Sequence, residues 1–585
     1  MNSQGNNPAK QFNPPKTFRD EMLKWNGWGY NDSYFTLSPE KDVFLVSERY
    51  KHLNDKIMPQ LRPWIEQNVG IDLDYKTPSI SLEDLERKWS SSGPQTRINE
   101  TFLEELRTNN ISYSNALLNR LNRSHGQTLH EILSLRQGNI GRIPDLVVWP
   151  KNEHETSKVV AIANELDIAL IPFGGGTSVS DALNCPENEQ RLICSLDMSL
   201  INKIIYIDEN NRTCRAQAGI IGQDLERQLN EKGFTCGHEP DSVEFSTLGG
   251  WISTRASGMK KNKYGNIEVP RISSGPDLHE IVLGSEGTYG VITEATIKIF
   301  PMPERAKYGS IIFPDFSFGV AFFREVAKQR CQCASLRLVD NVQFIMGQAM
   351  KVLSESIWHG IQSAISKLYI TRWKGFDIHK MVAATCVFEG SVEEVEQQSK
   401  KLFAIASKYG GVPGGEENGL YGYRLTFAIA YLRDLAMEYS VIGESFETSI
   451  PWDKVESVCR NVKVLLQKES ARHGVKYPIV ATCRVTQVYD AGACVYFYFG
   501  FNYRDLQKDP IKVYEEIEIA ARKEILACGG SISHHHGVGK LRKQFMASTV
   551  GFIGISLLKS IKHEIDPNNV FASNNLIDSS SNNKI

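Results

Sequence analysis

The chain has 585 residues, 41% of them hydrophobic, with a formal net charge of -2. Such a composition indicates a globular protein with room for two or three domains, and it excludes the overall basic field typical of nucleic-acid binding. The eleven cysteines show no Cys-x-x-Cys spacing, so a zinc site or thiol exchange is not indicated and a reducing compartment fits best.

Residues 1–20 are rich in Asn, Gln and Pro, and we expect them to be disordered. The N-terminus lacks the order of a secretory signal, and no apolar run is expected to span a bilayer, so the protein should be soluble or peripherally bound. Residues 21–140 contain helical patterns such as Leu82–Trp89 and Phe102–Leu106. We therefore predict a helical N-terminal region.

Residues 141–305 alternate strand and helix patterns, as expected for an α/β unit. The strand Ile168–Ile171 runs into Pro172–Ser178, which contains three consecutive glycines. Such glycines permit positive φ and bring backbone N–H groups against an anion. The segment is either a tight turn or a phosphate cradle, and the segments that follow it in the chain favour the cradle.

Three more segments rich in Gly, Ser and Thr occur in the same region: Asp241–Gly250, Thr254–Gly258 and Gly284–Gly290. Together with the glycine loop they suggest a long phosphorylated or dinucleotide ligand. The pattern Gly-x-Gly-x-x-Gly is absent, so a Rossmann fold is disfavoured.

These ordered motifs resemble the FAD-binding domain of the vanillyl-alcohol oxidase and p-cresol methylhydroxylase superfamily over about residues 140–320. The resemblance implies FAD, and because no histidine lies in the glycine loop we expect it to be bound non-covalently. The implied cofactor residues are Pro172, Phe173, Gly174, Gly175, Gly176, Thr177, Ser178, Asp241, Ser242, Val243, Glu244, Phe245, Ser246, Thr247, Thr254, Arg255, Ala256, Ser257, Glu286, Gly287, Thr288, Tyr289, Gly290, Val291 and Ile292.

Residues 306–540 form a second α/β region, in which long crossovers predict an antiparallel sheet covered by helices. We expect this region to cap the flavin and to bind substrate. Residues 541–578 read as a helical segment that returns to the FAD domain, and residues 579–585 as a disordered tail. The predicted fold is therefore α+β, with two FAD-binding subdomains and an α/β cap.

Three stretches of the cap, Tyr421–Asp434, Cys483–Phe499 and His534–Lys540, resemble the alkylglycerone-phosphate synthases, a family within that superfamily. The resemblance implies a net non-redox exchange that forms the ether bond of ether lipids. Acyl-dihydroxyacetone phosphate and a long-chain fatty alcohol would give alkyl-dihydroxyacetone phosphate and a fatty acid. The family implies a covalent adduct between the flavin N5 and the substrate carbon.

The same resemblance assigns roles to residues in the cap. Tyr496 matches a proton donor and acceptor, and Arg433 and Arg337 match substrate-binding or activity-linked arginines. In a strand Tyr496 and Tyr498 share one face, and Tyr496 would need cations from the histidines, arginines or Lys540 to act as a base. Arg433 could instead pair with Asp434 at the surface, and Arg337 could belong to a structural ion pair.

The family resemblance implies that the triplet His534, His535 and His536 is important for activity. In a strand its middle member faces away from the outer two, so the triplet should not grip one metal and no metal is expected. We expect an active-site strand here.

Other functional classes remain open from the residues. A D-2-hydroxy-acid dehydrogenase or oxidase has the same fold, and a lipid-binding protein could keep FAD as a structural element. The apolar and basic segment 358–374 is either core or a membrane-facing gate. The family implies a homodimer in the peroxisome, peripheral to its membrane, and Asn583-Lys584-Ile585 weakly resembles a peroxisomal address.

Overall fold

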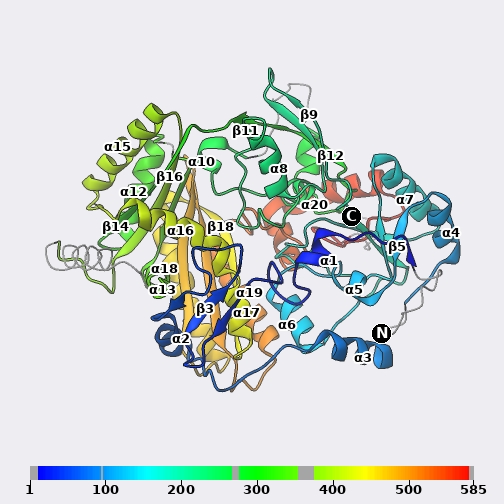
Figure 1. Cartoon of the computed structure of the whole chain (residues 1–585), viewed down its shortest axis with the longest axis horizontal. Helices are drawn as coiled ribbons and strands as arrows, with labels where there is room; N and C mark the ends of the chain where they lie inside the picture. Colours follow the sequence, from blue (N-terminus) through cyan, green and yellow to red (C-terminus); the bar gives the residue numbers. More distant parts are fainter. Residues whose placement is uncertain (1–10, 94–95, 267–275, 332, 353–373, 579–585) are drawn as a thin grey trace.

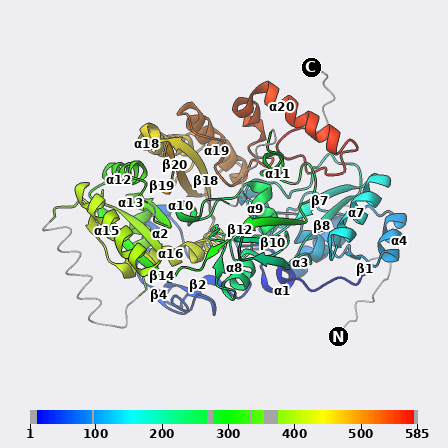
Figure 2. The same ribbon diagram turned by 90° about the horizontal axis from the view of Figure 1, so that it is seen from above.

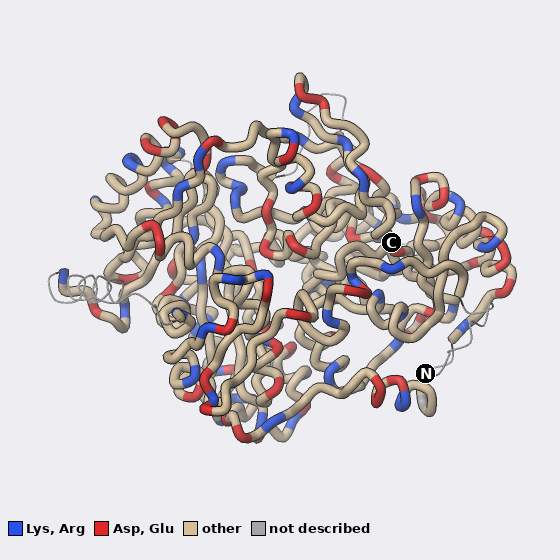
Figure 3. Tube along the Cα trace, in the orientation of Figure 1, with Lys and Arg blue, Asp and Glu red and all other residues tan. Residues whose placement is uncertain are grey.

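The computed structural model describes residues 11–93, 96–266, 276–331, 333–352 and 374–578. Two sheets dominate the molecule: a seven-stranded sheet in one half and a five-stranded sheet in the other (Figure 1). Lys and Arg are interspersed with Asp and Glu over the described trace (Figure 3), and the net charge is close to zero.

The N-terminal region combines helices with short strands. Its helices are α1 (Phe18–Met22), α2 (Leu61–Val69), α3 (Leu82–Ser92), α4 (Glu100–Thr108), α5 (Leu117–Leu121) and α6 (Leu129–Gln137). Its strands are β1 (Gln11–Phe12), β2 (Tyr34–Leu37), β3 (Val43–Val46), β4 (Ile57–Met58) and β5 (Ser112–Ser114). The small sheet β2-β3-β4 is an addition to the predicted helical region.

The predicted disorder of residues 11–20 was wrong. Strand β1 pairs with β5, and Asp20 forms an ion pair with Arg123, whose side chain is fully buried. Arg123 also bonds to Asp197 of the FAD domain at 2.8 Å. A composition-based prediction of disorder could not anticipate this buried ionic anchor.

The FAD domain contains the five-stranded sheet, in the order β1-β5-β6-β8-β7, where β6, β8 and β7 are parallel. These elements are β6 (Leu146–Trp149), α7 (Glu153–Glu165), β7 (Ala169–Phe173) and β8 (Ile193–Asp197). Strand β7 leads directly into the glycine loop.

A second subdomain is built on the three-stranded sheet β12-β10-β9. Its strands are β9 (Ile204–Asp208), β10 (Thr213–Gln217), β11 (Phe234–Thr235), β12 (Glu294–Lys298) and β13 (Phe300–Pro301). Its helices are α8 (Gly222–Asn230), α9 (Leu248–Thr254), α10 (Lys261–Tyr264) and α11 (His279–Val282).

The cap contains a seven-stranded antiparallel sheet in the order β17-β14-β16-β15-β19-β20-β18, which confirms the predicted sheet type. Its strands are β14 (Arg305–Phe313), β15 (Ser335–Val339), β16 (Val382–Gly390), β17 (Val412–Pro413), β18 (Val441–Pro451), β19 (Ile479–Val488) and β20 (Gly492–Asn502). Its helices are α12 (Phe316–Lys328), α13 (Asn341–Ala349), α15 (Val392–Lys408), α16 (Glu416–Ile429), α17 (Leu432–Met437), η2 (Trp452–Lys454), α18 (Val455–Arg472) and α19 (Pro510–Ala527).

The two faces of the cap sheet have different partners. Helices α12, α15, α18 and α19 form the main apolar core against one face. The opposite face carries Arg337, Arg484 and Tyr496 and lines a cavity shared with the FAD domain. The sheet is therefore a rigid wall that places polar side chains opposite the glycine loop.

The chain ends with η3 (Lys543–Phe545) and α20 (Met546–Ile565), and a return to the FAD domain, where Phe571 bridges to Leu170 of β7. Figure 2 shows α20 at the outer edge of the molecule beside α19. Among the described residues, the stretch Lys543–Ile565 is long and apolar enough to cross a bilayer by length and composition. This finding corrects the expectation that no apolar run reaches that length.

Candidate functional site

The candidate site is a cavity of about 520 Å³ between the FAD domain and the cap. The glycine loop forms part of its wall, and its glycines are required by close packing. A Cβ on Gly175 would lie 2.2 Å from the carbonyl oxygen of Phe245, and one on Gly174 would lie 2.6 Å from Thr247 Oγ1. Gly176 adopts a φ of 67°, which side chains rarely allow.

Most residues predicted to bind the cofactor line this cavity. They are Pro172, Phe173, Gly174, Gly175, Gly176, Thr177, Ser178, Asp241, Ser242, Ser246, Thr247, Thr254, Ala256, Ser257, Glu286, Gly287, Gly290, Val291 and Ile292. The cavity thus brings together four segments that lie far apart in the sequence.

Six predicted cofactor residues lie outside the cavity lining. Arg255 pairs with Glu280 at the surface, Glu244 accepts a hydrogen bond from Tyr50, and Phe245 packs against Tyr30. Val243, Thr288 and Tyr289 complete this set. The side chains of these six residues point away from the cavity, because successive residues of a loop point in different directions.

The cap sheet contributes a row of polar side chains. Tyr496 on β20 lies directly opposite Arg484 on β19 and Glu447 on β18. Directly opposed residues share a face, so all three point to the same side of the sheet. Tyr496 and Tyr498 stack with ring centroids 6.2 Å apart, as the strand pattern predicts.

Two arginines share one carboxylate at the cavity wall. Asp241 accepts from Arg337 at 2.9 Å and from Arg484 at 3.0 Å. Burial would raise the pKa of Asp241, but the two guanidinium groups outweigh burial and lower it to about 2. The wall therefore carries a carboxylate and two cations, with one positive charge in excess.

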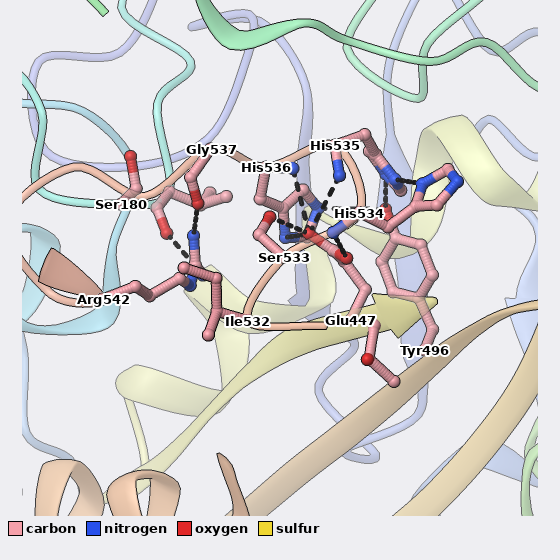
Figure 4. A network of polar contacts seen from close by, with 12 residues as sticks. Ser180, Glu447, Tyr496, Ile532, Ser533, His534, His535, His536, Gly537 and Arg542 are labelled. Carbon is pink, nitrogen blue, oxygen red and sulfur yellow. Dashed lines mark hydrogen bonds and ion pairs between the residues drawn. The ribbon is translucent and has the colours of Figure 1, made fainter. Parts of the chain in front are cut away.

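The histidine triplet lies in an irregular loop, so the predicted active-site strand was wrong. The reason is Glu447, a buried carboxylate that accepts from the backbone N–H groups of His534, His535 and His536 and from Ser533 Oγ. These bonds wrap the loop around one carboxylate, as Figure 4 shows. The three imidazoles are consequently not arranged in strand alternation.

A chain of hydrogen bonds connects the tyrosines and the triplet. Tyr496 Oη lies 2.6 Å from His535 Nε2 and 3.0 Å from His536 Nε2. His535 Nδ1 lies 2.7 Å from His534 Nδ1, and His534 Nε2 lies 2.6 Å from the hydroxyl of Tyr489. This arrangement can pass a proton from the cavity to the groups behind it.

Burial sets the protonation states of this chain. It lowers the pKa of His534 to about 3 and also lowers the pKa values of His535 and His536, so neutral imidazoles are favoured. Burial and Asp241 raise the pKa of Tyr496 well above its usual value, and Arg484 opposes them. A neutral phenol beside a neutral imidazole can donate its proton to that imidazole.

Arg433 and Lys540 occupy different places. Both Nη atoms of Arg433 donate to Gln127, and its Nε lies 4.0 Å from Asp434, which is bound to Lys24 at 2.9 Å. Arg433 lines the cavity, so the alternative of a surface ion pair is not what the structure shows. Lys540 instead donates to the carbonyl oxygen of Asp181 and does not face Tyr496.

One end of the cavity is apolar. It is lined by side chains from α2, α13, α16 and α17 and from nearby strands: Trp64, Ile65, Val69, Ile71, Met346, Phe427, Leu432, Leu435 and Val441. Such an arm suits an aliphatic chain. Most of the segment 358–374, expected to be core or a gate, lies outside the described residues.

The structure adds functional candidates that the sequence did not reveal. Arg484 lies in the stretch Cys483–Phe499, but a strand arginine alone gives no signal of function. Glu447 gave no signal either, since only the fold places it beside the triplet. Oxygen, sulfur and nitrogen atoms of Glu447, Cys494, His534 and His535 lie within 4.8 Å of one another, but the backbone donors to Glu447 already occupy that carboxylate.

The polar cavity wall fits a large polar cofactor. Within the part of the chain that the structure describes, Arg337 Nε, Arg433 Nε, Arg484 Nε and Thr486 Oγ1 are buried atoms without a hydrogen-bond partner, and all four residues line the cavity. Buried polar groups are normally paired, so these atoms indicate a bound polar molecule.

Comparisons with known proteins agree with this geometry. Residues 144–269 match the model of the FAD binding domain family, and residues 302–576 match that of the C-terminal domain of FAD linked oxidases. The cofactor of the chain is therefore FAD.

Two curated relatives and one solved structure carry the same name. The chain is 59% identical to the alkyldihydroxyacetonephosphate synthase of Caenorhabditis elegans, over 96% of both chains. It is 28% identical to the synthase of Dictyostelium discoideum over 94% of this chain and 92% of the relative. A solved structure of an alkyldihydroxyacetonephosphate synthase superposes with a TM-score of 0.80 at 26% identity, covering 94% of this chain and 98% of the other. The predicted α+β fold is confirmed.

Proposed function

The chain belongs to the alkyldihydroxyacetonephosphate synthase family, and we propose that Arg433, Tyr496 and the histidine triplet carry out its reaction. Acyl-dihydroxyacetone phosphate exchanges its acyloxy group for the alkoxy group of a long-chain alcohol. The products are alkyl-dihydroxyacetone phosphate and a fatty acid, and the exchange is net non-redox. FAD, when bound, supplies the electrophilic activation of the substrate carbon.

The glycine loop and the other lining segments hold FAD non-covalently. Pro172–Ser178 offers backbone N–H groups and hydroxyls to the pyrophosphate, in agreement with its glycine-dependent packing. Asp241 bridges this cofactor site to the cap through Arg337 and Arg484. Cofactor and substrate sites are therefore joined by one ionic cluster.

The substrate phosphate binds to the arginines of the wall. Among the described residues, the hydrogen bonds of Arg433 go to the neutral Gln127, and its Nε lies 4.0 Å from Asp434, so its charge is available to a dianion. Arg337 completes the pocket beside Thr426, to which it donates at 2.7 Å. Guanidinium groups suit phosphate because they present paired donors.

Tyr496 moves the proton of the reacting carbon. The phenol oxygen accepts the proton of the substrate carbon that bears the ester oxygen while its own proton passes to His535 at 2.6 Å. Both transfers reverse once the alcohol has replaced the carboxylate, and the proton of the alcohol leaves with the carboxylate as the fatty acid. The cation of Arg484, 4.6 Å from the Tyr496 ring centroid, stabilises negative charge that develops on the phenol oxygen.

The aliphatic chains of the ester and the alcohol lie in the apolar arm. This arm begins beside the polar wall, so one end of each lipid reaches the reacting groups while its chain stays out of water. We also propose, from family membership, a peroxisomal location, peripheral membrane contact and a homodimer.

The observation that carries the proposal is the direct bond of Tyr496 to two partly buried imidazoles whose pKa values are lowered by burial. Tyr496→Phe removes the transferable proton and keeps the ring. We expect the variant to keep the visible absorbance of bound FAD, while its kcat falls by a factor of about one hundred or more. Tyr206→Phe, at an exposed tyrosine, is the control substitution. Phe497→Tyr would not serve as a control, because the ring of Phe497 is buried in the core.

The assay combines acyl-dihydroxyacetone phosphate with labelled hexadecanol and no electron acceptor. Ether product supports the synthase. Flavin bleaching by lactate or glycolate without ether product would instead indicate a D-2-hydroxy-acid dehydrogenase, and neither outcome would indicate a lipid-binding protein. Near-normal turnover of Tyr496→Phe would remove this residue from the mechanism.

A further inference from the structure

Helix α20 exposes an uncharged apolar surface that the reaction does not use. No charged residue occurs from Gln544 to Leu558. Phe552 and Ile553 are 86% and 87% exposed, and Val550 and Leu557 are exposed beside them. Single exposed apolar side chains are common on protein surfaces, but these four lie close together along one helix and form a patch.

The backbone of α20 presents this patch outward. Gly551 interrupts the helix with φ 72° and ψ 172°, and the two most exposed residues follow it directly. Ile555 and Leu558 on the inner side pack against a small core around Ile532, Phe545 and Met546. The helix is thus anchored on one side, and its kink leaves Phe552 and Ile553 in solvent.

This anchoring distinguishes a helix that lies on a membrane from one that spans it. Lys562, near the end of α20, is buried and bonds to Asp566 and to the carbonyl oxygens of Thr288 and Phe571. A span would have to pull this lysine out of the FAD domain. An amphipathic helix at the interface needs only its outer side chains to enter the lipid.

The segment around α20 carries no acidic side chain, since no Asp or Glu occurs between Glu524 and Glu564. Of its five Lys and Arg residues, Arg542 and Lys562 are buried, Lys540 bonds to the carbonyl oxygen of Asp181 and Lys543 pairs with Asp578, while Lys559 lies on α20 itself. No acidic side chain of this segment would therefore repel anionic headgroups. A second copy of the chain would instead bring two such acid-free segments together, so lipid is favoured as the occupant.

The inner side of α20 is also connected to the loop that carries the histidine triplet. The same small core contains Val538, which follows the histidine triplet by two residues. Val538 and Gly539 donate their backbone N–H groups to Glu286 of the cavity wall. We propose that α20, through the patch centred on Phe552 and Ile553, docks the enzyme on a phospholipid surface. This proposal rests on the proposed function, in which the substrates carry long aliphatic chains.

The test uses the full-length enzyme with FAD and vesicle flotation. Vesicles of phosphatidylcholine mixed with phosphatidylserine should carry the wild type to the top of the gradient. The variant F552S/I553S should bind at least about tenfold more weakly, because its two apolar side chains no longer enter the lipid. F552L/I553L should retain binding.

A matched control comes from another exposed apolar pair. Ile205 and Tyr206 on β9 are 47% and 45% exposed, and I205S/Y206S should float like the wild type. Equal flotation of F552S/I553S and wild type would overturn the proposal. So would a halved molar mass of F552S/I553S in light scattering, because the patch would then join two copies of the chain.

A second readout separates this proposal from the proposed function. With detergent-dispersed substrates F552S/I553S should keep wild-type kcat, since Phe552 and Ile553 do not line the cavity, and its rate should fall only with substrates embedded in vesicles. Loss of activity in detergent together with loss of bound FAD would mean a folding defect and overturn the docking role. Absence of ether synthesis in the wild type would instead refute the proposed function and leave the flotation result standing.

Discussion

Arg484 connects the electrostatics of the site to the chemistry of one phenol. Its guanidinium lies 4.6 Å from the ring centroid of Tyr496 and 5.1 Å from that of Tyr498, while it also donates to Asp241. Burial and, after it, Asp241 raise the pKa of Tyr496, and Arg484 is the cation that opposes them. Arg484 therefore acts on the proton transfer through Tyr496, as a positioning residue.

Replacing Arg484 should move the pH dependence of the reaction. Proton transfer from Tyr496 requires a neutral His535, so the rate rises with pH through the pKa of His535, which burial and Arg484 lower. Arg484→Gln removes a charge that lowers this pKa, and the rising limb of kcat should shift to higher pH by about one unit or more. The measurement is a kcat profile at saturating substrate with FAD content checked by absorbance.

Arg484→Lys retains the cation, so the rising limb of its kcat profile should lie close to that of the wild type. Exposed Arg330, paired with Asp490 at the surface, provides a control substitution to Gln. A uniform loss of kcat at every pH in Arg484→Gln, with no displaced limb, would assign this arginine a purely structural role.

At the scale of elements, His130 on α6 links three segments. Its Nε2 lies 3.2 Å from Asp181, which follows the glycine loop, and its Nδ1 lies 3.8 Å from Glu515 on α19. Burial opposes the charge of this imidazole, but Asp181, Glu131 and Glu515 outweigh burial and raise the pKa of His130 to about 9. The charged form is therefore favoured at neutral pH.

This shift makes a prediction about stability. Because the folded pKa is raised above the unfolded value, the contribution is fully present below about pH 6.5 and is lost as the pH rises through about 9. His130→Gln should lower the free energy of unfolding by on the order of 2 kcal/mol near pH 6, and the difference should shrink towards pH 10. Urea unfolding across this range measures it.

Exposed His154 on α7 gives the matching control, and His154→Gln should follow the wild-type curve. A constant difference between His130→Gln and wild type across the pH range would show that packing, rather than charge, is what the histidine contributes.

The sequence predicted long periodic elements well and irregular ones poorly. The helical pattern at 392–408 coincides with α15. This prediction was reliable because a long helix with one apolar face shows a clear periodicity and packs that face against the cap sheet. Strands β2 to β4 were missed, since each is short and gains its stability from tertiary contacts. The triplet was assigned to a strand, and only Glu447, on a distant strand, dictates the loop.

At the scale of the whole molecule, the cavity is assembled from distant parts of the chain. Residues of α2, the glycine loop, β19, β20 and the triplet loop all line it. The glycine loop was predicted from its residue types, which are chemically distinctive, whereas Tyr496 was predicted from the family resemblance. The apolar arm could not be predicted, because Trp64 and Ile65 look like ordinary core residues until the fold places them beside Leu435.

Since both halves line the cavity, FAD should stabilise the molecule as a whole. A ligand that binds only the folded state adds about 2.7 kcal/mol when its concentration is 100 times its Kd. Removing FAD should therefore lower the unfolding midpoint, and titrating FAD back should raise it with ligand concentration. Gly175→Ala should abolish this rise, because its Cβ would lie 2.2 Å from the Phe245 carbonyl oxygen. Gly347→Ala on α13, whose Cβ meets nothing within 4 Å and which does not line the cavity, should keep it. Equal behaviour of the two variants would show that the glycine loop does not hold the cofactor.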